Sequence, residues 1–173
     1  MRPDACDVPE ASAIGRHAID TAFFRDAYRT ALTRPGADVI DIFFGVFGHH
    51  PRWMQRVLLL RNRLAAAAGL DTPADGDILQ PSRRAHYQVG DTIGPWPIFG
   101  LSPTELIAGR DNRHLDFRLS VLREQVGPAP TAVISTVCTT RNPFGRVYLR
   151  LVIPFHIWGV QWLIARAHAA GRL

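Results

Sequence analysis

The segment LVIPFHIWGVQWLIA, residues 151–165, constrains the fold most because it is apolar on nearly every side of a helix. A helix of this kind belongs in a protein core or in a membrane. The run is shorter than the ~20 apolar residues that cross a bilayer, and Pro154, His156 and Gln161 interrupt it. Its polar face is too thin for a helix lying in a membrane interface. We therefore expect this helix to be enclosed by protein.

The rest of the chain supplies the elements that would enclose it. Residues 115–121 alternate apolar and polar side chains, which is typical of a strand with one buried face. Similar patterns predict strands at 20–32, 94–100 and 131–141, a hairpin over 104–124 turning at Asp111 and Asn112, and helices at 37–48 and 51–69. This order predicts an α+β fold in which a curved antiparallel sheet, with two short helices after its first strand, grips a long C-terminal helix.

Domain organisation follows from length and composition. Residues 1–15 are polar and contain proline, so we predict a flexible N-terminal arm. Residues 16–173 have the size of a single domain. The helix over 51–69 divides its side chains between an apolar row and a basic face, formed respectively by Trp53, Val57, Leu60 and Leu64, and by Arg52, Arg56 and Arg63.

The charge pattern bears on partners. All 20 basic residues are arginine and the net charge is +5, but no basic block is longer than Arg83–Arg84. A nucleic-acid-binding protein is expected to show a basic stripe, so we predict no nucleic acid. Contact with an anionic membrane surface or an acidic partner stays open. Cys6 and Cys138 lie far apart and the first residues lack an apolar leader, so we expect a cytoplasmic protein.

Three stretches of the chain resemble a known bacterial family. They are residues 43–70, 94–124 and 142–156, of which PRW, RHLDFRLSV and PFH are the most specific pieces. Together they resemble the family catalogued as domain of unknown function 2867, over residues 26–166. The element order also resembles the helix-grip fold of the START, polyketide-cyclase and birch-allergen (SRPBCC) superfamily. The family has no established activity, so the resemblance assigns no catalytic residue.

The superfamily resemblance implies a hydrophobic cavity between the sheet and the long helix, where members bind lipids, polyketides or aromatic metabolites. We therefore predict that this chain binds a small hydrophobic ligand there. A solid core, serving a structural or partner-binding domain, has the same sequence signature and stays open. The predicted ligand-binding residues are Phe24, Trp96, Phe99, Phe117, Tyr148, Phe155, His156 and Trp162.

Acid–base residues leave open whether the protein is an enzyme. Asp26 and Tyr28 share one strand face, and His156 lies in the enclosed helix. If all three reach one apolar cavity, they could serve a cofactor-free cyclase or dehydratase. The alternative is that Asp26 is exposed or paired with an arginine, Tyr28 caps the core and His156 makes a structural hydrogen bond.

Other polar residues give weaker signals. His49 and His50 lack a third ligand at metal-binding spacing, so we predict no metal site. His114 and Asp116 fall on what we expect to be the solvent side of the sheet. Phosphate-binding loops, dinucleotide fingerprints, serine-hydrolase elbows and zincin motifs are missing from the sequence, which predicts no cofactor.

Overall fold

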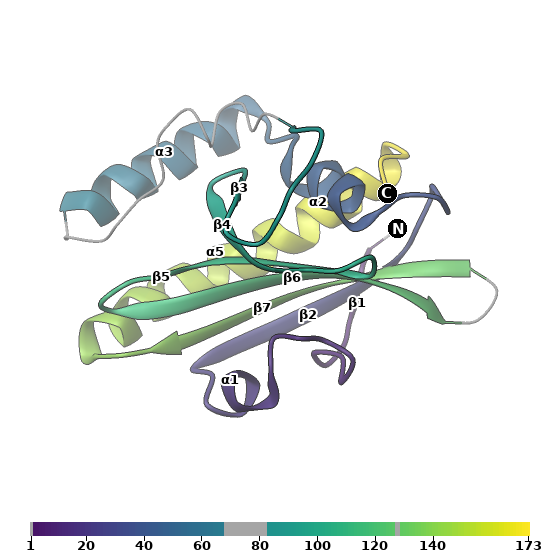
Figure 1. The fold of residues 1–173 in the computed structure, drawn as a ribbon. Coiled ribbons are helices and arrows are strands. Elements are labelled where there is room, and N and C mark those ends of the chain that lie inside the picture. Colours follow the sequence, from purple (N-terminus) through teal and green to yellow (C-terminus); the bar gives the residue numbers. More distant parts are fainter. Residues whose placement is uncertain (1, 68–82, 127–128) are drawn as a thin grey trace.

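A computed structural model describes residues 2–67, 83–126 and 129–173. Within them, one antiparallel sheet has the strand order β1-β2-β7-β6-β5-β4-β3. Figure 1 shows the sheet with the long C-terminal helix running beside it. The strands are β1 (Asp4–Ala5), β2 (Phe24–Ala31), β3 (Thr92–Ile93), β4 (Trp96–Leu101), β5 (Glu105–Asp111), β6 (Leu115–Val126) and β7 (Ala129–Thr140). The helices are α1 (Arg16–Asp20), α2 (Val39–Phe47), α3 (Arg52–Ala67) and α5 (Pro143–Ala169).

This architecture confirms the predicted α+β, helix-grip-like layout. Strand β2 forms where Phe24, Tyr28 and Thr30 recur on one face, and α2 and α3 follow it along the chain. The strands β5, β6 and β7 form a meander, as the predicted hairpin and its following strand required. Three elements were not predicted, because they are too short for a periodic signal: the two-residue strands β1 and β3 and the one-turn helix α1.

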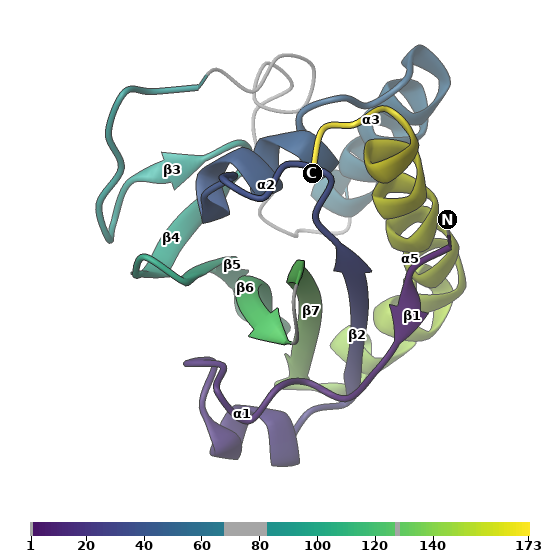
Figure 2. The same cartoon turned by 90° about the vertical axis from the view of Figure 1, so that its right-hand side faces the viewer.

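The sheet has two distinct faces, and the register assigns side chains to each. We call the face toward α2 and α5 the inner face and the opposite one the outer face (Figure 2). Asp26 of β2 pairs with Thr136 of β7, which pairs in turn with Leu119 of β6. Directly opposed residues point to the same side of a sheet, so these three share the inner face. Figure 2 shows α1 and the chain before it crossing the outer face.

The main core lies between the inner face and α2. This helix begins at a capping box in which the Asp38 side chain accepts a hydrogen bond from the Asp41 backbone amide. Its buried side chains Ile42, Phe43 and Val46 are at most 1% exposed. The C-terminal half of α5 adds the buried side chains Val160, Leu163, Ile164 and Ala167 to the same cluster.

Helix α5 is gripped on one side only, which corrects the expectation that protein encloses it. Asn142 caps its N-terminus, and Gly145 lies so close to the His114 carbonyl oxygen that a Cβ atom there would overlap it. The opposite side carries apolar side chains that the described elements leave largely uncovered: Phe144, Val147, Leu151, Phe155 and Trp158, between 41% and 75% exposed. By length and composition alone, α5 could cross a membrane, and only 22% of its apolar 18-residue stretch is buried.

The N-terminal residues pack on the sheet, unlike the flexible arm that the composition suggested. Asp4 and Ala5 pair with Arg29 and Tyr28 of β2. Further along the N-terminal segment, the Ser12 hydroxyl and the Ala13 amide donate hydrogen bonds to the Glu105 carboxylate, at 2.6 Å and 2.7 Å. The Ser120 hydroxyl donates to the same carboxylate at 2.5 Å. The N-terminal segment therefore supplies two of the three hydrogen bonds that satisfy this buried carboxylate.

Candidate functional site

An aspartate and a histidine meet where α5 crosses β2 on the inner face. Nε2 of His156 lies 3.4 Å from Oδ1 and 3.3 Å from Oδ2 of Asp26. Their side chains are 21% and 11% exposed. The strand alternation points Asp26 toward the helix, and helical spacing turns His156 toward the sheet. Two of the three predicted acid–base residues are therefore in contact, and Asp26 is paired with a histidine rather than an arginine.

The third predicted acid–base residue lies one strand repeat away. The Tyr28 hydroxyl accepts a hydrogen bond from Nε2 of Gln161 at 3.2 Å. Oε1 of Gln161 accepts in turn from the Arg2 guanidinium at 3.1 Å. Burial raises the pKa of Tyr28, and the negative charge of Asp26 raises it further, although the Gln161 hydrogen bond opposes both. Tyr28 therefore stays protonated at neutral pH.

Strand β7 contributes two polar groups beside this pair. The Thr136 side chain, opposite Asp26 in the register, is buried, and its hydroxyl has no hydrogen-bond partner among the described residues. Cys138 lies two residues further along the same face, opposite Phe24. Burial, together with the charge of Asp26, raises the pKa of the Cys138 thiol to about 12. At neutral pH it is an uncharged, weakly polar part of the wall.

One aromatic ring contacts the polar pair directly, and four more pack on the apolar clusters of the protein. The Phe24 ring meets the His156 imidazole edge-on, with centroids 5.5 Å apart at 87°. Phe117 packs on Trp96 at 5.7 Å and joins the two apolar clusters of the protein. Tyr148 packs on the smaller cluster and Trp162 on the larger one. These aromatic residues are all half-buried: Phe24, Trp96, Phe117, Tyr148 and Trp162.

Two of the predicted ligand-binding residues lie away from this group. Phe99 lies on the outer face, because the neighbouring Ile98 side chain is buried on the inner face. The guanidinium of Arg118, which also points outward, lies 3.6 Å from the centre of the Phe99 ring. Phe155 is 75% exposed on the open side of α5. The inner-face site therefore comprises Phe24, Asp26, Tyr28, Trp96, Phe117, Thr136, Cys138, Tyr148 and His156. The Trp162 ring packs on the main core but contacts Trp53 and Trp158 beside this site.

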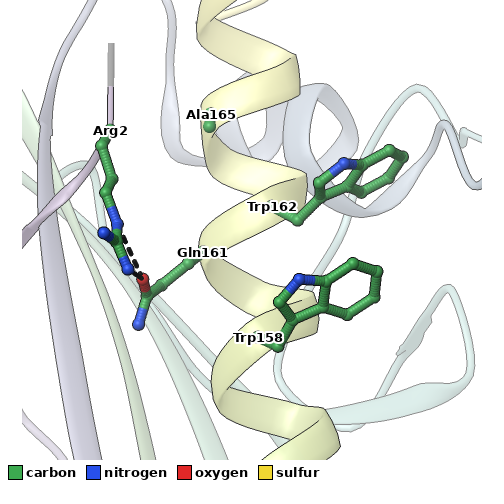
Figure 3. A pocket seen from close by; sticks show the side chains of 5 residues that line it. All are labelled: Arg2, Trp158, Gln161, Trp162 and Ala165. Atoms are coloured by element: carbon green, nitrogen blue, oxygen red, sulfur yellow. Dashed lines mark hydrogen bonds between the residues drawn. The ribbon is translucent and has the colours of Figure 1, made fainter.

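An open surface pocket of about 250 Å³ lies next to the site, along α5. Figure 3 shows its five lining residues: the indoles of Trp158 and Trp162 project from one side of the helix, and Arg2 approaches Gln161 on the other. The two indoles stack at 6.3 Å with an interplanar angle of 21°. The pocket is thus lined by two indole rings and by the guanidinium of Arg2.

The remaining sequence candidates have local structural partners. Nδ1 of His114 lies 3.2 Å from the Asn142 side chain at the start of α5, and Asp116 forms an ion pair with Arg141. Burial lowers the pKa of His49 and of His50. Across residues 2–67, 83–126 and 129–173, no group of three or more His, Cys, Asp or Glu side chains is placed to hold a metal ion.

Sequence reasoning missed Arg2, Gln161 and Thr136. No local pattern marks Arg2, because its contact with Gln161 spans 159 positions. Gln161 does carry a signal, since it is a polar residue in an apolar helix five positions after His156. Thr136 could have been found only from the register that places it opposite Asp26.

Together, the fold and the inner-face cluster define an α+β helix-grip-like domain with a polar site between its sheet and its C-terminal helix. The model of the family described as protein of unknown function (DUF2867) matches residues 18–162. The chain belongs to that family, which confirms the resemblance seen in its sequence. No curated protein matches the chain.

Proposed function

We propose that the protein binds a small hydrophobic molecule, such as a lipid, polyketide or aromatic metabolite, on the inner face beside α5. The observation that carries the proposal is the Asp26–His156 pair, set among the aromatic rings of Phe24 and Phe117. An apolar ligand with one or two oxygen atoms would cover the rings and exchange hydrogen bonds with the pair.

The buried Thr136 hydroxyl supports this proposal. Burying a hydroxyl without a hydrogen bond costs about 1–3 kcal/mol. Thr136 is 1% exposed, and its oxygen has no partner within the described chain. A ligand carbonyl or hydroxyl that displaces the side chains covering this oxygen would satisfy it. The half-buried aromatic rings, which a tightly filled core would bury fully, point the same way.

A second candidate function is acid–base catalysis on the bound molecule. The observation that favours it is the contact between the carboxylate of Asp26 and Nε2 of His156. The carboxylate would hold the imidazole in a fixed orientation, from which the histidine could take a proton from a ligand and return it. The protonated phenol of Tyr28 could donate a hydrogen bond to a ligand oxygen in such a step.

The chemistry of the cysteines suits a reducing compartment, and we place the protein in the cytoplasm. Cys6 and Cys138 are both free thiols. Burial raises the pKa of each, so neither is prone to oxidation as a thiolate.

The binding proposal is tested by following backbone amides in NMR spectra while an uncharged probe, 1-naphthol, is added to the full chain. We expect saturable shifts at Thr136, Cys138 and His156. The double variant Thr136→Val/His156→Leu should weaken binding by about tenfold, because it removes hydrogen bonds to the probe hydroxyl.

The matched control is Leu151→Ser/Phe155→Ser, which alters the open side of α5 and should leave the affinity unchanged. Shifts confined to the open side of α5, or equal affinity in all variants, would contradict binding at the inner face. Catalysis has a separate readout. If His156 takes part in a reaction, wild-type protein should carry the product and His156→Gln should carry the substrate. The two extracted molecules should then differ in mass.

A further inference from the structure

The open side of α5 carries a continuous row of exposed apolar residues. Phe144, Val147, Leu151, Phe155 and Trp158 follow one another at intervals of three or four residues, which aligns them on one side of a helix. We call this row the apolar stripe. Exposure ranges from 41% at Phe144 to 75% at Phe155. Soluble proteins seldom expose so many large apolar side chains together unless another surface covers them.

Helix α3 extends the apolar stripe sideways. The Trp53 ring contacts Trp158 at 5.7 Å and Trp162 at 5.6 Å, which joins the two helices. Val57 and Leu60 continue the exposed apolar row along α3 and are 54% and 59% exposed. The predicted row on α3 therefore exists, but it faces solvent; the side chain of Leu64 lies outside the described residues.

Charge identifies the surface that covers these two helices. Helix α3 contains four arginines, α5 contains three, and neither contains an aspartate or glutamate. Arg146, Arg150 and Arg166 are exposed on α5, the helix that carries the apolar stripe. The ion pairs formed between described residues use no arginine of either helix. Apart from Arg61, whose side chain lies outside the described part of the structure, their charges are therefore available for an anionic partner.

We propose that α3 and α5 dock the protein on an anionic phospholipid bilayer. The apolar stripe and the side chains of Trp53, Val57 and Leu60 would enter the boundary between headgroups and acyl chains, as interfacial apolar side chains do. The flanking arginines would contact lipid phosphates. Tryptophan is favoured at this depth of a membrane, which suits Trp53 and Trp158.

The pocket beside the apolar stripe fits one headgroup. Its guanidinium, Arg2, lies across α5 from the indoles of Trp158 and Trp162 (Figure 3). A phosphate could bind the guanidinium while an acyl chain lies along the indoles. This contact would fix the orientation of the docked protein, since Arg2 also holds Gln161 of α5.

A second copy of the chain fits the same surface poorly. A twofold interface would bring identical surfaces together and would place the arginines of α3 and α5 near those of the partner copy without any acidic residue from these helices. Like charges held close destabilise such a contact. An anionic bilayer supplies the opposite charge instead.

The test is flotation of the full chain with vesicles of phosphatidylcholine alone or mixed with phosphatidylglycerol, read together with tryptophan fluorescence. We expect binding to the mixed vesicles, a blue shift, and quenching by lipids brominated on their acyl chains. Raising NaCl from about 0.1 M to about 0.5 M should release the protein, because the Debye length shortens.

Two variants, each with a control, separate the apolar and the charge contributions to membrane binding. Leu151→Ser/Phe155→Ser should weaken binding more than about tenfold, whereas Val89→Ser, at a site 59% exposed in the chain before β3, should not change it. Arg146→Gln/Arg150→Gln should weaken binding about fivefold per arginine. The control Arg16→Gln/Arg34→Gln removes the same charge elsewhere and should have a smaller effect.

Three results would overturn the proposal: no binding to the mixed vesicles, equal binding by wild type and Leu151→Ser/Phe155→Ser, or a stable dimer in sedimentation that this variant dissociates. None of them depends on the inner-face site, so the ligand-binding proposal stands or falls separately.

Discussion

His156 of α5 contacts both carboxylate oxygens of Asp26 on β2, at 3.4 Å and 3.3 Å. This contact connects the helix to the sheet across 130 positions of sequence. Apolar side chains of α5 also pack in both core clusters of the protein. The same pair is the centre of the proposed ligand site, so its energetics bear on both stability and function.

Breaking this pair should destabilise the protein. His156→Leu leaves the Asp26 carboxylate, whose side chain is 11% exposed, without its partner. We expect the free energy of unfolding in urea to fall by about 1–3 kcal/mol. In a double-mutant cycle with Asp26→Leu, the coupling should be about 1 kcal/mol. Additive effects of the two substitutions would contradict a direct interaction.

The buried carboxylate of Glu105 should hold the N-terminal segment on the sheet. Glu105 is 5% exposed and accepts from Ser12, Ala13 and Ser120. Glu105→Ala should cost about 2–3 kcal/mol and speed amide exchange at Ala13. Glu10→Ala is the control, because the pair of Glu10 with Arg16 is exposed and should be worth less than about 1 kcal/mol. Unchanged exchange at Ala13 would mean that other contacts anchor the segment.

The protein should lose stability as the pH falls from 7 toward 5. Burial lowers the pKa of His50, and His49 lowers it further. Below the ordinary histidine pKa of about 6.5, the unfolded chain therefore binds protons that the native protein does not, so the free energy of unfolding decreases. Urea unfolding of His50→Gln should show a shallower dependence across this range. An equal slope in both proteins would contradict the burial of His50.

The Cys138 thiol should be unreactive in the native protein. Its pKa, raised to about 12, leaves almost no thiolate at pH 8, and burial blocks access. Iodoacetamide should label Cys6 before Cys138, and unfolding should expose both, as read by mass spectrometry. Because the unfolded thiol ionises near its ordinary value of 9.0, stability should also decline as the pH rises above that value. Labelling of Cys138 as fast as Cys6 would refute this.

Much of the fold was predictable because its elements carry strong local periodicity. The alternation in β6 and the helical patterns of α2 and α3 gave element type and order, and these fixed the antiparallel sheet. The apolar character of α5 was also plain, but a sequence does not say whether an apolar side chain meets protein or another surface. For Leu151 and Phe155 the expectation of enclosure was therefore wrong.

The site was predictable only where the pattern within a single strand or helix determines where a side chain points. Alternation along β2 correctly grouped Asp26 with Tyr28, and the helix placed His156 among apolar neighbours. Alternation along β4 likewise puts Phe99 and Trp96, three residues apart, on opposite faces of the sheet. Thr136 depends on pairing across strands, which no local pattern encodes.

The central claim, a small hydrophobic molecule held on the inner face, is tested most directly by native mass spectrometry of the full chain purified from its own cells. The account predicts an apolar compound bound at a fixed ratio, retained by Leu151→Ser/Phe155→Ser and lost from Thr136→Val/His156→Leu. A chain that carries no small molecule, or one whose bound compound survives the inner-face substitutions, would contradict it and favour a solid-core domain.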